Sequence, residues 1–446
     1  MQRYHELDAF NGAVLVAEGG RVLYEDAFGP AVLEFGVESS LETRFRIASI
    51  SKPMTVVLVM QLVEEGMLDL DEPIGRYLET VREDISTRVT TRQLLNHTSG
   101  LGREYLPNED IDRAYALGDL VAGINENVEF VGEPGAASTY SNAGYVLLAA
   151  IVETLRGRLF EDVLRVRLFG PAGMVSAGLE VEPSRSVERL SRGYRLRFGT
   201  HVSADRVNMS TMRGNGGVYA TVRDLYLFER AMRDDTLLSS ASREAVFTPE
   251  LGRYGFAWQI RENQSGFPEG VHRLAWHRGA NRGGFRTQLT MQLDGDRVVV
   301  LLANLDDSPR LEITQKLFEL MVYGETTLPT PSLAHRAMSR LRAEGVAGAA
   351  SMLREEPEAD AGGAINEILG FGHHAIRAGA FDEAVAAFEL CDEMFPGIAV
   401  IVVSRAYGYL RAGRLDEARV HAERALELDP GNSDALEVLA GVSPRY

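Results

Sequence analysis

Strand patterns stand at the two ends of the first three quarters of the chain, and helical patterns fill the stretch between them. Residues 12–17 and 21–24 are predicted as two strands, because Gly19-Gly20 between them supplies the positive φ values of a tight hairpin turn. Strand patterns return late, at residues 255–260, 273–278, 286–293 and 297–305. One antiparallel sheet assembled from both ends, with a helical subdomain inserted between them, unites these patterns. The expected fold class is therefore α+β, an antiparallel sheet flanked by helices.

The inserted stretch carries the patterns of several helices. Met54 to Glu65 is predicted as a buried helix that ends at Gly66, with Pro53 tolerated in its first turn. Further helices are predicted at residues 91–96, 142–155 and 159–168, and one follows the last strand at 311–322.

An internal repeat marks the C-terminal quarter as a separate helical region. The segment Ala-Gly-Ala-Phe-Asp-Glu-Ala at 378–384 recurs at 412–418 as Ala-Gly-Arg-Leu-Asp-Glu-Ala, and Pro396 recurs as Pro430, both with an offset of 34 residues. This period resembles that of tetratricopeptide repeats, in which each unit is a helix pair. Since about three units are needed for a stable array, the stretch 332–354 is expected to cap or dock it.

The two regions are separated by a linker pattern. Residues 326–331 include two prolines and three threonines, a composition that favours extended backbone. We therefore predict a domain at 1–325, a linker at 326–331 and an all-α helical-repeat domain at 332–446.

Charge and composition exclude several classes of function. The formal net charge is −18 and no run of Lys or Arg is present, so we expect no nucleic-acid partner. No stretch approaches the roughly 18 uninterrupted apolar residues of a membrane span. The opening residues lack an apolar signal-peptide core, which leaves the localisation unknown: we expect a cytoplasmic protein for the chain as given, and a periplasmic or secreted one if a leader was removed. The single cysteine, Cys391, excludes an intrachain disulfide and is expected to be a small buried helix residue.

Ser49-Ile50-Ser51-Lys52 places a hydroxyl and an amine three residues apart at the start of a predicted helix. Both side chains then lie on one face, about one turn apart, so the amine can reach the hydroxyl. A serine hydroxyl becomes an effective nucleophile when a neighbouring base takes its proton, and a lysine with a lowered pKa can be that base. Lysine occurs only at Lys52 and Lys316, whereas the other 44 basic residues are arginine, so a retained lysine is informative.

Three further motifs follow in order along the chain. They are Leu-Leu-Asn-His-Thr-Ser-Gly-Leu at 94–101, Tyr140-Ser141-Asn142, and His277-Arg278-Gly279. With the Ser-x-x-Lys motif, they resemble the serine β-lactamase-like, penicillin-binding-protein family, which includes class C β-lactamases, D-alanyl-D-alanine peptidases and family VIII carboxylesterases. The resemblance covers residues from about 10 to 323 and implies a β-lactamase/transpeptidase-like fold for this region.

The resemblance implies a role for each matching residue. Ser49 would attack an ester or amide carbonyl and form an acyl-enzyme, while Lys52 and Tyr140 move protons. Asn142 would hold a substrate carbonyl, and the backbone N–H of Ala280 would join that of Ser49 in an oxyanion hole. Gly279 would keep the strand low enough for substrate, with His277 near the leaving group or a substrate carboxylate.

Other candidate residues receive structural roles. His97 is expected to support the site rather than form a Ser-His pair, because the chain has no Gly-x-Ser-x-Gly elbow. The run 214–217, Tyr254 and Trp258 are expected at the pocket floor and rim. No cofactor is required and no set of paired metal ligands is evident, since His373-His374 falls in the repeat region, where a solvated helix face is expected.

The substrate class is less constrained than the mechanism. His277 replaces the lysine typical of β-lactamases and Arg278 replaces a small Thr or Ser, so an esterase or D-amino-acid peptidase acting on small esters, amides or short peptides is favoured. Arg278 could bind a carboxylate or point outward into solvent, and both readings stay open. The alternatives are a β-lactamase, an acyltransferase, or a non-catalytic interaction protein that grips a protein partner with its repeats.

Overall fold

The computed structural model describes residues 1–106, 109–197 and 200–442. It divides into two compact units, the first formed by Met1–Leu196 and His201–Leu328 and the second mainly by Pro329–Tyr446. The predicted repeat domain runs to residue 446, and its last four residues lie outside the described part.

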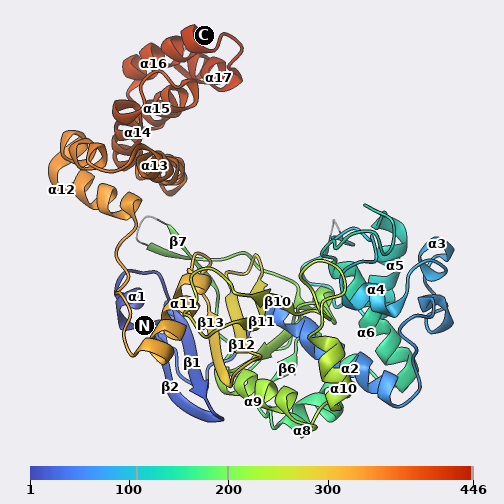
Figure 1. The fold of residues 1–446 in the computed structure, drawn as a ribbon. Helices are drawn as coiled ribbons and strands as arrows, with labels where there is room; N and C mark the ends of the chain where they lie inside the picture. Colours follow the sequence, from blue (N-terminus) through green and yellow to red (C-terminus); the bar gives the residue numbers. More distant parts are fainter. Residues whose placement is uncertain (107–108, 198–199, 443–446) are drawn as a thin grey trace. The chain divides into compact units, whose positions relative to one another are not determined.

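The first unit contains a six-stranded antiparallel sheet that draws its strands from both ends of the unit (Figure 1). Its strands, in the spatial order β10-β11-β12-β13-β1-β2, are Gln259–Glu262, Arg273–Ala280, Arg286–Gln292, Arg297–Ala303, Gly12–Glu18 and Arg21–Phe28. β1 pairs with β13 over its whole length, from Gly12 opposite Ala303 to Glu18 opposite Arg297. This pairing confirms the predicted sheet.

One predicted strand is displaced. The expected strand at 255–260 begins only at Gln259, because Ala257 has a φ of 65°, which breaks the extended backbone. β10 is therefore short, and it pairs only with Arg273–Trp276, the first half of β11.

Side chains that alternate along the strands fill a different core on each face of the sheet. Ala13 and Leu15 of β1 point into a large core shared with α2 (Ser51–Glu64), α6 (Asn142–Arg156) and α9 (Val222–Arg233). Val14 and Val16 point to the opposite face, where Phe318 of α11 (Arg310–Tyr323) covers them. The sheet thus lies between a thick helical layer and a thin one.

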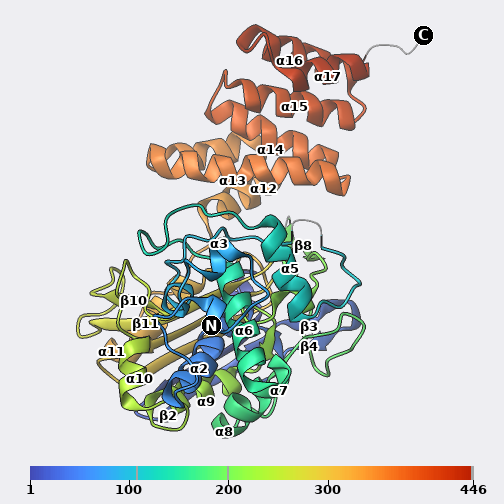
Figure 2. The ribbon, with the colours of Figure 1, turned by 90° about the vertical axis from the view of Figure 1, so that its right-hand side faces the viewer.

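The helices of the thick layer form where the sequence predicts them. α2 is apolar almost all round and ends before Gly66, whose φ of 70° stops the helix. α4 (Thr91–Leu95) starts with a capping box between Thr90 and Gln93, and α6 starts with the Ser141 hydroxyl accepting the N–H of Gly144. Figure 2 shows α2 and α6 in front of the sheet.

Shorter elements complete the first unit. The remaining helices and helical turns are α1 Gln2–Glu6, η1 Leu33–Phe35, η2 Ala48–Ile50, η3 Ile74–Arg76, α3 Glu83–Ser86, α5 Leu117–Asn127, α7 Phe160–Leu164, η4 Arg165–Phe169, α8 Gly170–Ala172, η5 Met209–Met212 and α10 Ser240–Val246. The remaining strands are β3 Pro30–Val32, β4 Val37–Glu38, β5 Phe45–Arg46, β6 Gly178–Leu179, β7 Tyr194–Arg197, β8 Thr200–Ser203 and β9 Val218–Ala220. These seven strands were not predicted from the sequence, because two to four residues are too few to show a period.

From residue 329 to residue 442 the second unit contains helices and their connections, as the repeat pattern predicts (Figure 2). Its helices are α12 Leu333–Arg354, α13 Glu358–Ala378, α14 Phe381–Met394, α15 Ala399–Arg411, α16 Leu415–Leu428 and α17 Ser433–Val442. The repeated Ala-Gly pairs fall at the turns after α13 and α15, where Gly379 and Gly413 have φ values of 79° and 76°. α12 is kinked at Gly345.

Two details of the second unit concern single residues. Cys391 is buried in α14, as expected. The solvated face expected for His373 is wrong, because its ring packs against Phe388 at 5.1 Å and its Nε2 lies 2.9 Å from the Ser404 hydroxyl of α15. Among the described helices, none combines the length and apolarity that crossing a membrane requires.

The thin layer offers a test of the packing. Phe318 is fully buried against the sheet, whereas Leu320 on the same helix is 44% exposed. We expect Phe318→Ala to lower the free energy of unfolding by about 3–5 kcal/mol and Leu320→Ala to change it by less than about 0.5 kcal/mol. Both tryptophans, Trp258 and Trp276, belong to the first unit, so urea unfolding followed by tryptophan fluorescence reports on that unit. Equal effects of the two variants would contradict the assigned packing.

Candidate active site

Ser49 lies in the short helical turn η2, which ends at Ile50, directly before the first residue of α2. The preceding residue, Ala48, has a φ of 48°, a left-handed conformation that a non-glycine residue rarely adopts. Strain of this kind persists only when the surrounding structure enforces it, and it is concentrated at functional sites. The serine side chain is half-buried at the start of a helix, where the backbone dipole favours negative charge.

Lys52 is fully buried one turn further along, and its amine touches three groups. Nζ lies 3.2 Å from the Ser49 Oγ, 2.9 Å from Oδ1 of Asn142 and 2.8 Å from the backbone oxygen of Asn215. The Ser-x-x-Lys spacing thus brings amine and hydroxyl together as the helical geometry predicts.

The surroundings of Lys52 favour its neutral form. Burial lowers the pKa of Lys52 well below its ordinary value, and the positive charge of Arg103 lowers it further, while Glu104 acts in the opposite direction. Two of the three contacts of Nζ are oxygens that can only accept a hydrogen bond. A neutral amine has two N–H groups for these oxygens and directs its lone pair at Ser49.

Tyr140 contacts Ser49 from the side of the helical subdomain. Its hydroxyl lies 2.9 Å from the Ser49 Oγ, and its ring centroid lies 4.8 Å from the Lys52 Nζ. Burial raises the pKa of Tyr140 above its ordinary value, and the hydrogen bond with Ser49 offsets only part of this effect. Tyr140 is therefore a phenol at neutral pH, which can donate a proton but is not a resident base.

His97 supports this arrangement without touching Ser49. Its backbone oxygen accepts the N–H of Thr139, and its Nδ1 accepts the N–H of Ser141 at 3.3 Å. Its ring lies 4.4 Å from that of Tyr140 and 5.0 Å from that of Tyr145. Burial holds the pKa of His97 well below its ordinary value. The residue orients the Tyr140 segment, which is the structural role predicted for it.

His277 lies on β11, on the face of the sheet that Ser49 occupies. Its Nδ1 lies 3.0 Å from the backbone oxygen of Arg278, which can only accept, so Nδ1 carries the proton and Nε2 is an acceptor. Burial, with the nearby Lys52, lowers the pKa of His277 to about 3. A neutral His277 therefore supplies no positive charge to a substrate carboxylate.

Gly279 lies where β11 passes closest to the Ser49 turn. A Cβ at this position would lie 2.1 Å from the backbone oxygen of Ile47 and 2.1 Å from Oγ1 of Thr287. The glycine thus makes room for the protein's own backbone, and the room for substrate expected from the sequence stays a prediction. Arg310 donates a hydrogen bond to the backbone oxygen of Gly279 from the other side.

Arg278 and Ala280 belong to the opposite face of the same strand. Leu274 and Trp276 of β11 contribute to the core under α11, and alternation sends Arg278 and Ala280 the same way. Both are exposed. Of the two readings left open for Arg278, the structure supports the outward one.

Two residues near the site, Arg103 and Tyr105, were not singled out from the sequence. The Arg103 guanidinium lies 5.7 Å from the centroid of the Tyr140 ring. The Tyr105 hydroxyl accepts a hydrogen bond at 2.8 Å from the side-chain amide of Asn215, which belongs to the predicted run 214–217 and whose backbone oxygen accepts from Lys52. Arg103 and Tyr105 follow closely after the 94–101 motif, so their position next to it was the available signal. Trp258 is fully buried in the large core, which is deeper than the pocket rim expected for it.

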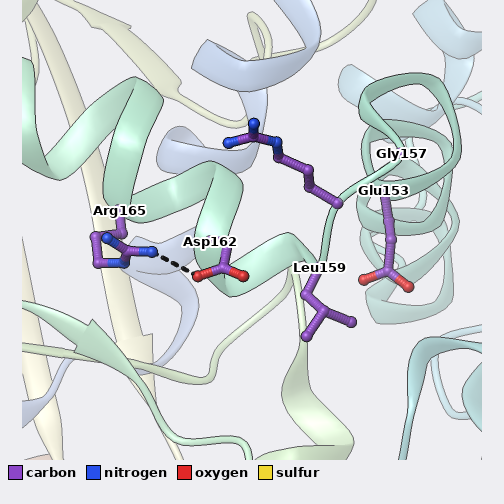
Figure 3. Close-up of a pocket in the computed structure, with 6 residues that line it drawn as sticks. Glu153, Gly157, Leu159, Asp162 and Arg165 are labelled. Atoms are coloured by element: carbon purple, nitrogen blue, oxygen red, sulfur yellow. Dashed lines mark hydrogen bonds and ion pairs between the residues drawn. The ribbon is translucent and has the colours of Figure 1, made fainter.

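A separate hollow lies at the far end of α6, around Glu153, Gly157, Leu159 and Asp162 (Figure 3). Arg165 lines it and forms an ion pair with Asp162 at 2.7 Å. Glu153 is 11 residues from Asn142 on the same helix, which corresponds to about 16 Å. This hollow is therefore distinct from the Ser49 site. The described residues contain no group of three or more His, Cys, Asp or Glu side chains placed to hold a metal ion.

Known families match both units. The Beta-lactamase family model matches residues 2–320, and a Tetratricopeptide repeat model matches residues 399–442. The first unit is thus a serine hydrolase of the penicillin-recognising type, and the chain belongs to the β-lactamase family, as the motifs predicted. Its C-terminal region carries tetratricopeptide repeats.

Individual relatives agree with this family. A penicillin-binding protein of Bacillus subtilis (strain 168) is 31% identical over 343 residues, which are 72% of this chain and 74% of the relative. A D-aminopeptidase of Brucella anthropi is 30% identical over 285 residues, which are 61% of this chain and 52% of the relative. The crystal structure of a D-amino acid amidase from Ochrobactrum anthropi SV3 complexed with D-phenylalanine has the same fold, with a TM-score of 0.60 at 22% identity over 72% of this chain and 96% of that one.

The close approach at Gly279 generates a prediction. We expect Gly279→Ala to push β11 away from the Ser49 turn and to lower the rate at which a fluorophosphonate probe labels the protein by about tenfold or more, since a displacement of 1 Å costs up to about a hundredfold. Gly132 has open space at its Cβ position, so Gly132→Ala is the matched control and should label at the native rate. Equal labelling of both variants would contradict the steric argument.

Proposed function

We propose that Ser49 is the nucleophile of a hydrolase that cleaves ester or amide bonds through an acyl-enzyme. The observation that carries the proposal is the position of the Ser49 Oγ, 3.2 Å from the Lys52 amine and 2.9 Å from the Tyr140 hydroxyl. A nucleophile in contact with a buried amine and a phenol has both a proton acceptor and a proton donor at hand.

In the proposed mechanism, Lys52 takes the proton of Ser49 as the serine oxygen attacks the carbonyl carbon. Asn142 and Asn215 accept the two N–H groups of the neutral amine and fix its lone pair toward Ser49. Tyr140 then donates its phenolic proton to the leaving group, and the proton on Lys52 restores the phenol. Water attacks the acyl-enzyme by the same steps in reverse, so no net proton is consumed at the enzyme.

The remaining site residues are proposed to bind the substrate. The backbone N–H groups of Ser49 and Ala280 would stabilise the oxyanion of the tetrahedral intermediate. The close packing of Gly279 on Ile47 supports this pairing, because it holds β11 against the Ser49 turn. Since Oδ1 of Asn142 is used by Lys52, its amide nitrogen is the end that would hold a substrate carbonyl, and the neutral Nε2 of His277 would accept a hydrogen bond.

Esters, amides and short peptides containing D-amino acids are the substrates we propose. The related D-aminopeptidase and the similar fold of a D-amino acid amidase favour amides of D-residues, and the neutral His277 in place of a lysine favours these substrates over β-lactams.

For the domains, we propose a hydrolase at 1–325, a linker at 326–331 and a repeat domain at 332–446. The family match at 2–320 and the start of α12 at Leu333 favour these limits. The tetratricopeptide match further suggests that the repeats bind a protein partner, and we propose no nucleic-acid partner for this acidic chain.

Loss of the nucleophile tests the proposal. We expect Ser49→Ala to lower turnover of p-nitrophenyl esters and D-alanyl p-nitroanilide by at least about a thousandfold, because the covalent step is lost. Ser265→Ala is the matched control, since Ser265 is exposed in the loop between β10 and β11, outside the Ser49 site, and it should retain turnover. Ser49-dependent hydrolysis of nitrocefin at a comparable rate would favour the β-lactamase alternative, and transfer to an added alcohol would favour the acyltransferase. An absence of Ser49-dependent turnover would favour the alternative of a non-catalytic interaction protein.

The protonation states generate a pH prediction. Because the neutral amine is the base, kcat/KM of a neutral ester should rise with pH through the lowered pKa of Lys52, well below the value of about 10.4 for a free lysine. It should then stay high until Tyr140 ionises, above the ordinary tyrosine value of about 10. A pH profile of hydrolysis measures both limbs. An acid limb near pH 10 would mean that Lys52 is an ordinary charged lysine.

A further inference from the structure

Few charged groups on the Ser49 face of the sheet can meet an anionic substrate. Lys52 and His277 both have lowered pKa values that favour their neutral forms. Arg278 is charged, but it lies on the face of α11. Arg103 is a positively charged residue that the described contacts place beside the catalytic groups, because its guanidinium lies over the Tyr140 ring at 5.7 Å.

The backbone around Arg103 is fixed by the site itself. The backbone oxygen of Gly102 accepts from the Ser141 hydroxyl at 2.9 Å, which ties residue 102 to the Tyr140-Ser141-Asn142 motif. The Tyr105 hydroxyl donates to the backbone oxygen of Thr211 and accepts from Asn215, whose own oxygen holds Lys52. Arg103 is thus held between two anchors that also position the catalytic amine.

The side chain of Arg103 itself remains available. It is 65% exposed, and its ion-pair partner is Glu104, the next residue, at 3.0 Å with 72% exposure. Such an exposed pair contributes little free energy, about 0–1 kcal/mol. A substrate carboxylate can therefore take the place of Glu104 at little cost, and the planar guanidinium can bind it through two parallel hydrogen bonds.

We propose that Arg103 is a specificity-determining residue that binds a carboxylate of the substrate beside Tyr140. This proposal rests on the proposed Ser49 hydrolase. Substrates with a carboxylate are then preferred over neutral ones of the same shape, and substrates with a free ammonium group are disfavoured, because Arg103 repels them.

Matched substrates measure this preference in the full-length protein. One pair is p-nitrophenyl hemisuccinate and p-nitrophenyl butyrate, which differ in a terminal carboxylate or methyl group. The other series is D-alanine p-nitroanilide with a free, acetylated or succinylated amine. Rates of Ser49→Ala are subtracted as background, since hemisuccinate esters also hydrolyse unaided.

In Arg103→Gln we expect the ratio of kcat/KM for the anionic over the neutral substrate to fall roughly two- to fivefold, the range of one partly exposed ion pair. Most of the change should lie in KM. Arg103→Glu should invert the preference, Arg103→Lys should retain most of it, and added salt should weaken it in the native protein.

A second readout separates charge from structure. Arg103 and Glu104 are the charged groups that act on Lys52, so removing the cation in Arg103→Gln should move the acid limb of the pH profile of the neutral ester to higher pH. Arg103→Lys keeps the charge and should leave the limb in place. A purely structural role would not be rescued by lysine in this way.

Arg165→Gln is the matched control, because Arg165 is 68% exposed and paired with a neighbouring carboxylate at the distant hollow of Figure 3. This variant should change neither the ratio of kcat/KM for the anionic over the neutral substrate nor the acid limb of the pH profile. Ser49-dependent turnover with a ratio that Arg103 variants leave unchanged in both series overturns the role of Arg103 alone. An absence of Ser49-dependent turnover on every substrate overturns the proposed hydrolase instead.

Discussion

The pairing of β1 with β13 is the contact on which the rest of the first unit depends. It joins residues 12–18 to residues 297–303, so a segment of nearly 300 residues begins and ends in adjacent strands of one sheet. The helices between these strands must then pack on the sheet, and the turn that carries Ser49 meets β11 at Gly279. The site therefore lies where the inserted helical layer contacts the late strands of the sheet. It can form only after the strands from both ends of the unit have paired.

Burial of the Lys52 amine determines the chemistry of this site. Water would solvate Lys52 better than the interior does, so the fold must supply partners for its nitrogen. They come from η2, which directly precedes α2, from the start of α6 and from the loop at Asn215. Since the three segments are far apart in the sequence, the arrangement reports on the packing of the whole helical layer. The same burial that favours the neutral form of Lys52 also keeps Tyr140 protonated. One environment therefore determines the protonation states of two residues with different functions.

The sequence predicted what depends on local spacing. The reach from Lys52 to Ser49 follows from helical geometry, the sheet follows from strand patterns at both ends, and the repeat helices follow from their period. Long-range contacts and the local path of the backbone could not be predicted in this way. The steric reason for Gly279 depends on Ile47, more than 200 residues away, and the tautomer of His277 depends on the local path of β11. The late start of β10 depends on the backbone angle of Ala257, which no residue pattern signals.

The shortness of β10 has a consequence for solubility. In the part of the chain that the structure describes, β10 pairs with β11 only as far as Trp276, so residues 277–280 form an incomplete edge of the sheet. An uncovered edge can pair with the edge of another molecule and start aggregation. The exposed Arg278 places a charge in this segment, and charged side chains are a common means of keeping sheet edges apart. Arg278 can thus help to keep this edge from pairing with other copies of the protein.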